Sequence, residues 1–255
     1  MIRGFGVVTL VAACNFSHGA GPGDATPAGD AAAPRDASVA PDGARDAAAP
    51  RDAPPVEVQL LQQITAYAPN GSPLNATLPA TPQPGDVLVM VGAANHGTLA
   101  GVSGGGVATW TRAAYSPTNA NIEIWFGVTD GSSATVTITF PNNPLSIWMV
   151  VSEWSGLTGA LDAAHATAGK TSPASAGAIT TGARDLIIFG VADSAPNMFG
   201  APSGGAWSAL DGITSAPIVQ AEWYGELDPT SGYAPQVSET AHAWDAAIAA
   251  LEIDP

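Results

Sequence analysis

Two parts of the chain, about 100 residues apart, repeat the same order of aromatic, apolar and glycine residues. Trp125-Phe126-Gly127 is echoed 98 residues later by Trp223-Tyr224-Gly225. Asp86-Val87-Leu88-Val89 is echoed 99 residues later by Asp185-Leu186-Ile187-Ile188. Further echoes, at spacings of 96 to 100 residues, join Ser103-Gly104-Gly105 to Ser203-Gly204-Gly205, Trp110 to Trp207 and Trp148 to Trp244. Repetition at a near-constant period predicts two structurally related halves, although regular turn spacing in any β-sandwich also produces some periodicity.

The segments between the predicted turns have the length and composition of β-strands. Asp86–Ala93 is a continuous apolar run of strand length, which predicts a strand buried at the centre of a sheet. Ala134–Phe140 alternates apolar residues with threonine, as expected for a strand with one face in the core. Ala243–Ile253 fits both a helical and an alternating pattern, and its echo of the segment around Trp148 favours a strand.

These segments together predict an all-β fold. At least ten short strands are separated by Gly, Pro, Asn, Ser and Thr, and no segment is clearly helical. We expect residues 56–255 to form a single antiparallel β-sandwich, jelly-roll-like, with two pseudo-repeated halves. The alternative is two tandem immunoglobulin-like sandwiches. The single domain is favoured because composition shows no linker-like change between Gly156 and Gly182.

The first 13 residues have the pattern of an export signal. Arg3 supplies a positive charge, Phe5–Ala13 forms a short apolar stretch, and small residues precede a cleavage point. The apolar stretch is too short to cross a bilayer, which needs about 20 apolar residues. The chain is therefore expected to be exported.

The residues at the cleavage point, Val11-Ala12-Ala13-Cys14, resemble the lipobox of bacterial lipoproteins. The resemblance implies that Cys14 carries the lipid and becomes the first residue of the mature chain. An ordinary secretory signal with an incidental cysteine is the alternative. By the same resemblance, Asn15 after the cysteine favours the outer membrane or cell surface over the inner membrane. Cys14 is the only cysteine, so an intrachain disulfide is excluded and the domain must rely on an apolar core.

Residues 14–55 consist of the lipidated Cys14 and a low-complexity tether. Ala33-Pro34-Arg35-Asp36-Ala37 recurs as Ala49-Pro50-Arg51-Asp52-Ala53 among further Ala, Pro, Gly and Asp. Such a composition cannot bury enough apolar surface to offset its ordering entropy, so disorder is predicted. The tether would span roughly 35 Å as a flexible coil, or about 130 Å if proline kept it extended.

The folded region is strongly acidic. From residue 56 onward, 16 Asp and Glu oppose Arg112, Lys170 and Arg184, a formal charge of −13. Nucleic acid and anionic lipid both require basic patches, so nucleic acid is excluded as a partner and contact with the membrane is expected through the lipid alone.

Motif searches yield no catalytic residue and no metal centre. The chain lacks G-x-S-x-G, H-E-x-x-H, a Walker loop and zinc spacing. Glu123 and Glu222 lie in the two echoed strands, but the alignment offsets them by one position, which argues against a symmetric glycosidase pair. Glu153 follows a long apolar run and lies either partly buried or at a strand end facing water. A structural Ca²⁺ would need oxygen ligands, for which no spaced motif exists among Asp162, Asp193, Asp211 and Asp245.

A binding surface is the remaining candidate. Exposed aromatic rings stack on sugars, whereas Trp at paired strand positions more commonly packs the core. Trp154, the one Trp without an echo, and Tyr115 and Tyr233, which lie near turns, are predicted as ligand-binding residues. The expected function is that of a cell-envelope lipoprotein displaying a non-catalytic sandwich for binding or adhesion, with a surface glycan or another envelope protein as partner. A carbohydrate-active hydrolase and a purely structural envelope protein are the alternatives.

Overall fold

The computed structural model describes residues 57–95, 97–142, 144–197, 199–210, 218–240 and 242–255. The predicted signal, Cys14 and the tether lie outside these residues, as does Asp211. These described residues belong to one compact unit. Within the described part of the chain, no helix is long and apolar enough to cross a membrane.

Regular structure in the described residues consists of β-strands. The strands of the first half are β1 (Gln59–Asn70), β2 (Leu74–Thr77), β3 (Val87–Asn95), β4 (Gly101–Gly104), β5 (Thr111–Ser116), β6 (Ile122–Val128), β7 (Thr135–Thr139) and β8 (Leu145–Ser155). Those of the second half are β9 (Leu157–Gly169), β10 (Ala174–Ser175), β11 (Ile179–Thr181), β12 (Asp185–Asn197), β13 (Ser208–Leu210), β14 (Ile218–Leu227), β15 (Thr230–Tyr233), β16 (Gln236–Val237) and β17 (Trp244–Ile253).

Each half contributes one five-stranded antiparallel sheet. The strand order is β1-β8-β3-β6-β5 in the first half and β9-β17-β12-β14-β13 in the second. The two orders correspond strand for strand, because the first and last long strands of each half lie side by side. The predicted all-β sandwich with two related halves is confirmed.

Smaller sheets complete each half. The first half adds a β2-β7-β4 sheet, and the second adds the pairs β10-β16 and β11-β15. The order β1-β8-β3-β6 in one sheet, with β2-β7-β4 in the other, is that of a jelly roll. An immunoglobulin sandwich has a different strand order, so the halves are not immunoglobulin-like, although each half does pair its large sheet with smaller sheets of its own.

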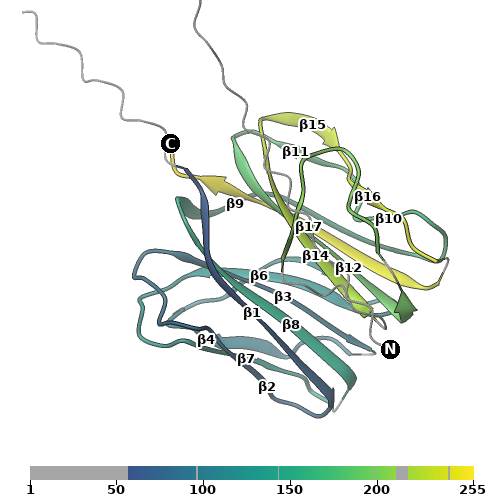
Figure 1. Cartoon of the computed structure of the whole chain (residues 1–255), viewed down its shortest axis with the longest axis horizontal. Coiled ribbons are helices and arrows are strands. Elements are labelled where there is room, and N and C mark those ends of the chain that lie inside the picture. The colour runs from purple at the N-terminus through teal and green to yellow at the C-terminus, as the bar shows by residue number, and fades with distance from the viewer. Residues whose placement is uncertain (1–56, 96, 143, 198, 211–217, 241) are drawn as a thin grey trace, which may run out of the picture. The chain divides into compact units, whose positions relative to one another are not determined.

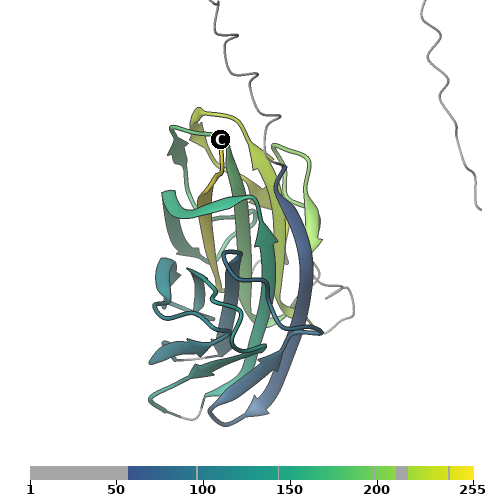
Figure 2. The same cartoon turned by 90° about the vertical axis from the view of Figure 1, so that its left-hand side faces the viewer.

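The two five-stranded sheets pack face to face, and the smaller sheets lie on their outer sides (Figure 1). On β3, Val87, Val89 and Val91 face the opposite sheet, whereas Leu88 and Met90 face the β2-β7-β4 sheet. Most antiparallel sheets expose one face to water, but here the central strands are buried on both. This burial explains why Asp86–Ala93 and its echo are continuous apolar runs. In Figure 2, β1 (dark blue) runs along one edge of the stack.

The repeated Trp-aromatic-Gly motif contributes to the packing of these sheets. Trp125 and Trp223 point outward to the smaller sheets, while Phe126 and Tyr224 point inward between the large sheets. A Cβ on Gly225 would lie 2.7 Å from the Ala206 carbonyl oxygen. The glycine is therefore required where the chain entering β13 crosses over β14.

Buried hydrogen bonds between Asp245 and residues 116–120, which we call the clasp, also join the halves. The buried Asp245 carboxylate on β17 accepts a hydrogen bond from the Ser116 hydroxyl at the end of β5. It also accepts backbone N–H bonds from Thr118 at 3.0 Å, Asn119 at 2.7 Å and Ala120 at 2.6 Å. Ala243–Ile253 thus contains a strand, as the echo predicted, and that strand holds a loop of the other half.

Candidate functional site

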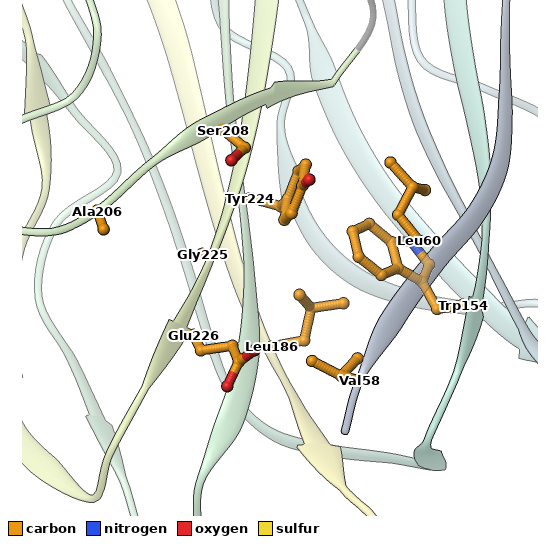
Figure 3. Close-up of a pocket in the computed structure, with 9 residues that line it drawn as sticks. All are labelled: Val58, Leu60, Trp154, Leu186, Ala206, Ser208, Tyr224, Gly225 and Glu226. Atoms are coloured by element: carbon orange, nitrogen blue, oxygen red, sulfur yellow. The ribbon is translucent and has the colours of Figure 1, made fainter. Parts of the chain in front are cut away.

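A pocket of about 350 Å³ opens between the two halves, where edge strand β1 of one sheet faces β13 and β14 of the other (Figure 3). We call it the seam pocket. Its lining residues come from both halves and are Val58, Leu60, Trp154, Leu186, Ala206, Ser208, Tyr224, Gly225 and Glu226. Aliphatic and aromatic groups therefore form most of its surface.

Strand register places the two aromatic rings of the seam pocket. Leu60 pairs with Trp154, so both side chains project from the inner face of the first sheet. Tyr224 pairs with Ser208 and with Ile188, which places it on the inner face of the second sheet. The rings of Trp154 and Tyr224 meet edge to face, with centroids 4.8 Å apart. This geometry is favourable for aromatic pairs and fixes one wall of the pocket.

Trp154 is 1% exposed, so the prediction that it presents an exposed ring is wrong. It lies at the edge of the core between the sheets, and its Nε1 donates a hydrogen bond of 2.8 Å to Ser152 Oγ. Its lack of an echo among the other tryptophans suggested exposure. The β1 strand and Tyr224 cover the ring instead.

The rim of the seam pocket carries an ion pair. Glu226 borders the pocket and is bonded to Arg184, and both side chains are more than two-fifths exposed. Exposed ion pairs contribute at most about 1 kcal/mol. The Glu226 carboxylate can therefore exchange its partner at little cost.

Tyr115 lies in a separate network on the outer side of the first half. Its hydroxyl bonds to Thr98 Oγ1 at 3.0 Å, and the Arg112 guanidinium lies 4.4 Å above its ring. Arg112 Nη1 also lies 3.6 Å from the buried Glu123 carboxylate. That carboxylate accepts bonds from the Trp125 indole and from a backbone N–H. Arg112 thus covers one face of the Tyr115 ring.

Tyr233 lies in an aromatic column of the second half. It stacks on Trp207, which in turn contacts Phe189 and through it Trp223. Burial raises the pKa of Tyr233. Trp154, Tyr115 and Tyr233 therefore belong to three separate clusters and do not form one surface.

The two glutamates considered for hydrolysis point in different directions, as their offset predicted. Glu123 pairs with Gly92 and shares the outer face with Trp125. Glu222 pairs with Gly190, whose added Cβ would meet Ile122 between the two large sheets. Gln220 donates a side-chain hydrogen bond to Glu222 there. The two carboxylates cannot act on one bond.

Two pairs of carboxyl groups lie close together elsewhere. Glu153 is buried and accepts a 2.7 Å bond from the Gln83 backbone. Burial, together with hydrogen bonding and repulsion from Glu153, raises the pKa of Asp86 to about 6. In the second half, burial and the Asp162 carboxylate raise the pKa of Asp185 to about 7.

Three of the four acidic residues considered for Ca²⁺ have other contacts, and Asp211 lies outside the described residues. Asp162 accepts backbone bonds from Gly182 and Ala183, and Asp245 forms the clasp. Asp193 lies 3.6 Å from His242. Among the described residues, no group of three or more His, Cys, Asp or Glu is arranged to hold a metal ion.

Sequence analysis missed that Tyr224 lines a pocket, because the repeated motif marked it as part of the frame. The available signal was the lack of an echo for Trp154, its ring partner. With the geometry defined, comparisons with known proteins add no relative: no protein-family model, no curated protein and no solved structure matches the chain.

Proposed function

We propose that this chain is an exported, lipid-anchored binding protein that displays its β-sandwich at the outer membrane or cell surface. The seam pocket is its ligand site. The observation that carries this proposal is an apolar, aromatic-walled pocket built from both halves, with a carboxylate at its rim. Ligand sites in proteins combine such walls with a few polar groups that fix orientation.

Three polar groups of the lining support an orienting role. They are the hydroxyls of Ser208 and Tyr224 and the carboxylate of Glu226. The expected tether ends at residue 55, and Val58 already lines the pocket. A ligand would thus be held beside the point where the chain enters the domain.

A substitution that fills the seam pocket with a larger side chain tests whether the pocket binds a ligand. Ser208→Phe places a ring on the inner face of β13, on the same side as Tyr224. Ala209→Phe is the matched control, because Ala209 pairs with Trp223 and projects from the opposite face of that edge strand. In a fragment screen by ligand-observed NMR, we expect apolar and aromatic fragments to bind the wild type and Ala209→Phe but not Ser208→Phe. Absence of binding to the wild type, or equal binding to all three, would contradict the proposal.

Membrane attachment is tested separately through Cys14. Cys14→Ser removes the thiol that the lipobox resemblance assigns to the lipid, so the protein should move from the membrane fraction to the soluble exported fraction. Wild-type chain is the control, and fractionation with immunoblotting is the measurement. Retention of Cys14→Ser in membranes would overturn the anchoring.

A glycan remains a second candidate ligand, favoured by one observation. Tyr67 on β1 is 48% exposed, and its ring lies over Trp148 with centroids 4.2 Å apart. An exposed, supported ring is the geometry on which a sugar can stack. Glycan-array binding that is lost in Tyr67→Ala and kept in Ser208→Phe would support this candidate, and binding unaffected by Tyr67→Ala would reject it.

A further inference from the structure

The seam pocket has a chemical preference that its walls and rim define together. Val58 and Leu60 supply aliphatic surface, and Tyr224 supplies aromatic surface, with the buried Leu186 and Trp154 behind them. At about 350 Å³, the pocket lies toward the small end of ligand sites. It therefore suits one aromatic ring or a short branched alkyl group.

The charge around the pocket is negative. Glu226 is the acidic group of the lining, and Figure 3 shows its carboxylate beside Leu186 at the pocket edge. The region from residue 56 onward carries a formal charge of −13. A field of this sign attracts cations and repels anions, and aromatic ring faces add to the attraction.

The existing partner of Glu226 does not block a ligand. Arg184 is 43% exposed on its side chain and Glu226 is 44% exposed, so their ion pair is screened by water. A ligand ammonium can replace the Arg184 guanidinium, which then returns to solvent. The Ser208 and Tyr224 hydroxyls are further hydrogen-bond acceptors in the lining.

We infer that the seam pocket binds an organic ammonium ion, with its aromatic or branched apolar body against Leu60 and Tyr224 and its charge at Glu226. This inference rests on the proposed function of the pocket. Both a free arylalkylamine and the N-terminal aromatic residue of a peptide carry this chemistry, and the experiment separates them.

The experiment uses the full chain with Cys14→Ser, titrated calorimetrically with matched probes. The probes are phenethylamine, 3-phenylpropionate, 2-phenylethanol, the peptide Phe-Gly-Gly and its N-acetylated form. We expect phenethylamine to bind about tenfold more tightly than the other two small probes. If the peptide source is correct, Phe-Gly-Gly binds more tightly than phenethylamine, and acetylation removes the gain. If the free amine is the source, the peptide binds less tightly than phenethylamine.

Three variants test whether the ligand ammonium binds at Glu226. Glu226→Gln keeps the size of the side chain and should weaken phenethylamine about three- to tenfold while leaving 2-phenylethanol unchanged. Asp228→Asn is the matched control, because it removes one exposed carboxylate two residues away and outside the lining. Arg184→Gln removes the competing cation and should strengthen phenethylamine binding.

Different results would overturn the two proposals, which are the seam pocket as ligand site and its preference for an ammonium ion. If no probe binds, or if Ser208→Phe binds all probes as the wild type does, the seam pocket is not the ligand site and the proposed function is overturned. If the probes bind with equal strength and Glu226→Gln equals Asp228→Asn, the pocket stands but the ammonium preference is overturned.

Discussion

The Asp245 carboxylate allows a quantitative test of how the two halves are held together. It is fully buried and accepts one hydroxyl and three backbone N–H bonds from residues 116–120 of the other half. We predict that Asp245→Ala lowers the free energy of unfolding by about 3–5 kcal/mol. Such a loss is large for a domain whose total stability is expected to be about 5–15 kcal/mol.

The size of this loss in unfolding free energy depends on which N–H and O–H donors are left without an acceptor in Asp245→Ala. Ser116 and Ala120 are 4% and 3% exposed, so their donors would stay buried and unpaired. Thr118 is exposed and Asn119 is half-buried, so their N–H groups can bond to water instead. Each hydrogen bond to a charged group contributes about 1.5–3 kcal/mol, and two uncompensated bonds give about 3–6 kcal/mol. Relaxation of the loop removes part of this loss.

Urea denaturation followed by tryptophan fluorescence measures the loss. We expect Asp245→Ala to lower the midpoint with an unchanged m-value, because the folded surface stays the same. Asp245→Asn keeps one carbonyl acceptor and should lose about 1–3 kcal/mol. Asp228→Asn, an exposed carboxylate, should stay within about 0.5 kcal/mol of wild type. A loss below about 1 kcal/mol for Asp245→Ala would refute the clasp as a stabilising contact.

Three further perturbations test other parts of the structure by the same unfolding assay. Burial, with a neighbouring carboxylate, raises the pKa of Asp185 to about 7 and that of Asp86 to about 6. Both hold protons in the folded state that the unfolded chain, with a pKa near 3.8, releases. Their contribution to stability therefore falls as pH rises from about 4 to about 7, and Asp185→Asn should flatten that slope; an unchanged slope would contradict this. Gly225→Ala should cost about 1–3 kcal/mol through overpacking, whereas Gly101→Ala, whose Cβ meets nothing within 4 Å, should cost less than about 1 kcal/mol. Equal costs would contradict the close crossing at Gly225. Trp154→Ala should cost about 3–5 kcal/mol, and a cost near zero would be inconsistent with its burial.

The strand content and the related halves could be predicted because they rest on local patterns. The apolar run from Asp86 and its echo from Asp185 became the equivalent central strands β3 and β12. The echo of Trp125 at Trp223 also gave the correct register, since Trp125 pairs with Met90 and Trp223 with the equivalent Phe189. The echo of Trp148 at Trp244 is one position out of step, since Trp148 pairs with Ala93 and Trp244 with Asp193. A run that is apolar at every position does not show which layers cover its two faces. The stacking of the two large sheets could not be derived for this reason.

The sites were harder to predict because they depend on contacts between distant residues. Asp245 bonds to Ala120 across 125 positions, and no short motif marks such a pair. Trp154 has no echo, which suggested exposure, but edge strand β1 covers it. The region from Tyr67 to Pro84 is rich in Pro, Asn, Gly and Thr, a composition that favours loops. In the structure β1 continues through Asn70, because it pairs with β8 along its whole length.

The seam pocket lies where the two halves differ. Trp154 pairs with Val87 as Leu251 pairs with Leu186, so the two residues occupy equivalent places in the two sheets. Trp154 meets Tyr224 across the seam, and the equivalent position of the motif in the first half is Phe126, which lies in the same core cluster as Leu251. Phe126 is buried, whereas Tyr224 opens onto the pocket beside Glu226. In a duplicated fold, repeated residues maintain the frame, because both halves need them for the same packing. Residues that break the repeat do not have that requirement. Here Trp154 and Glu226 break it, Trp154 behind Tyr224 in the wall and Glu226 at the rim to which we assign the ligand charge.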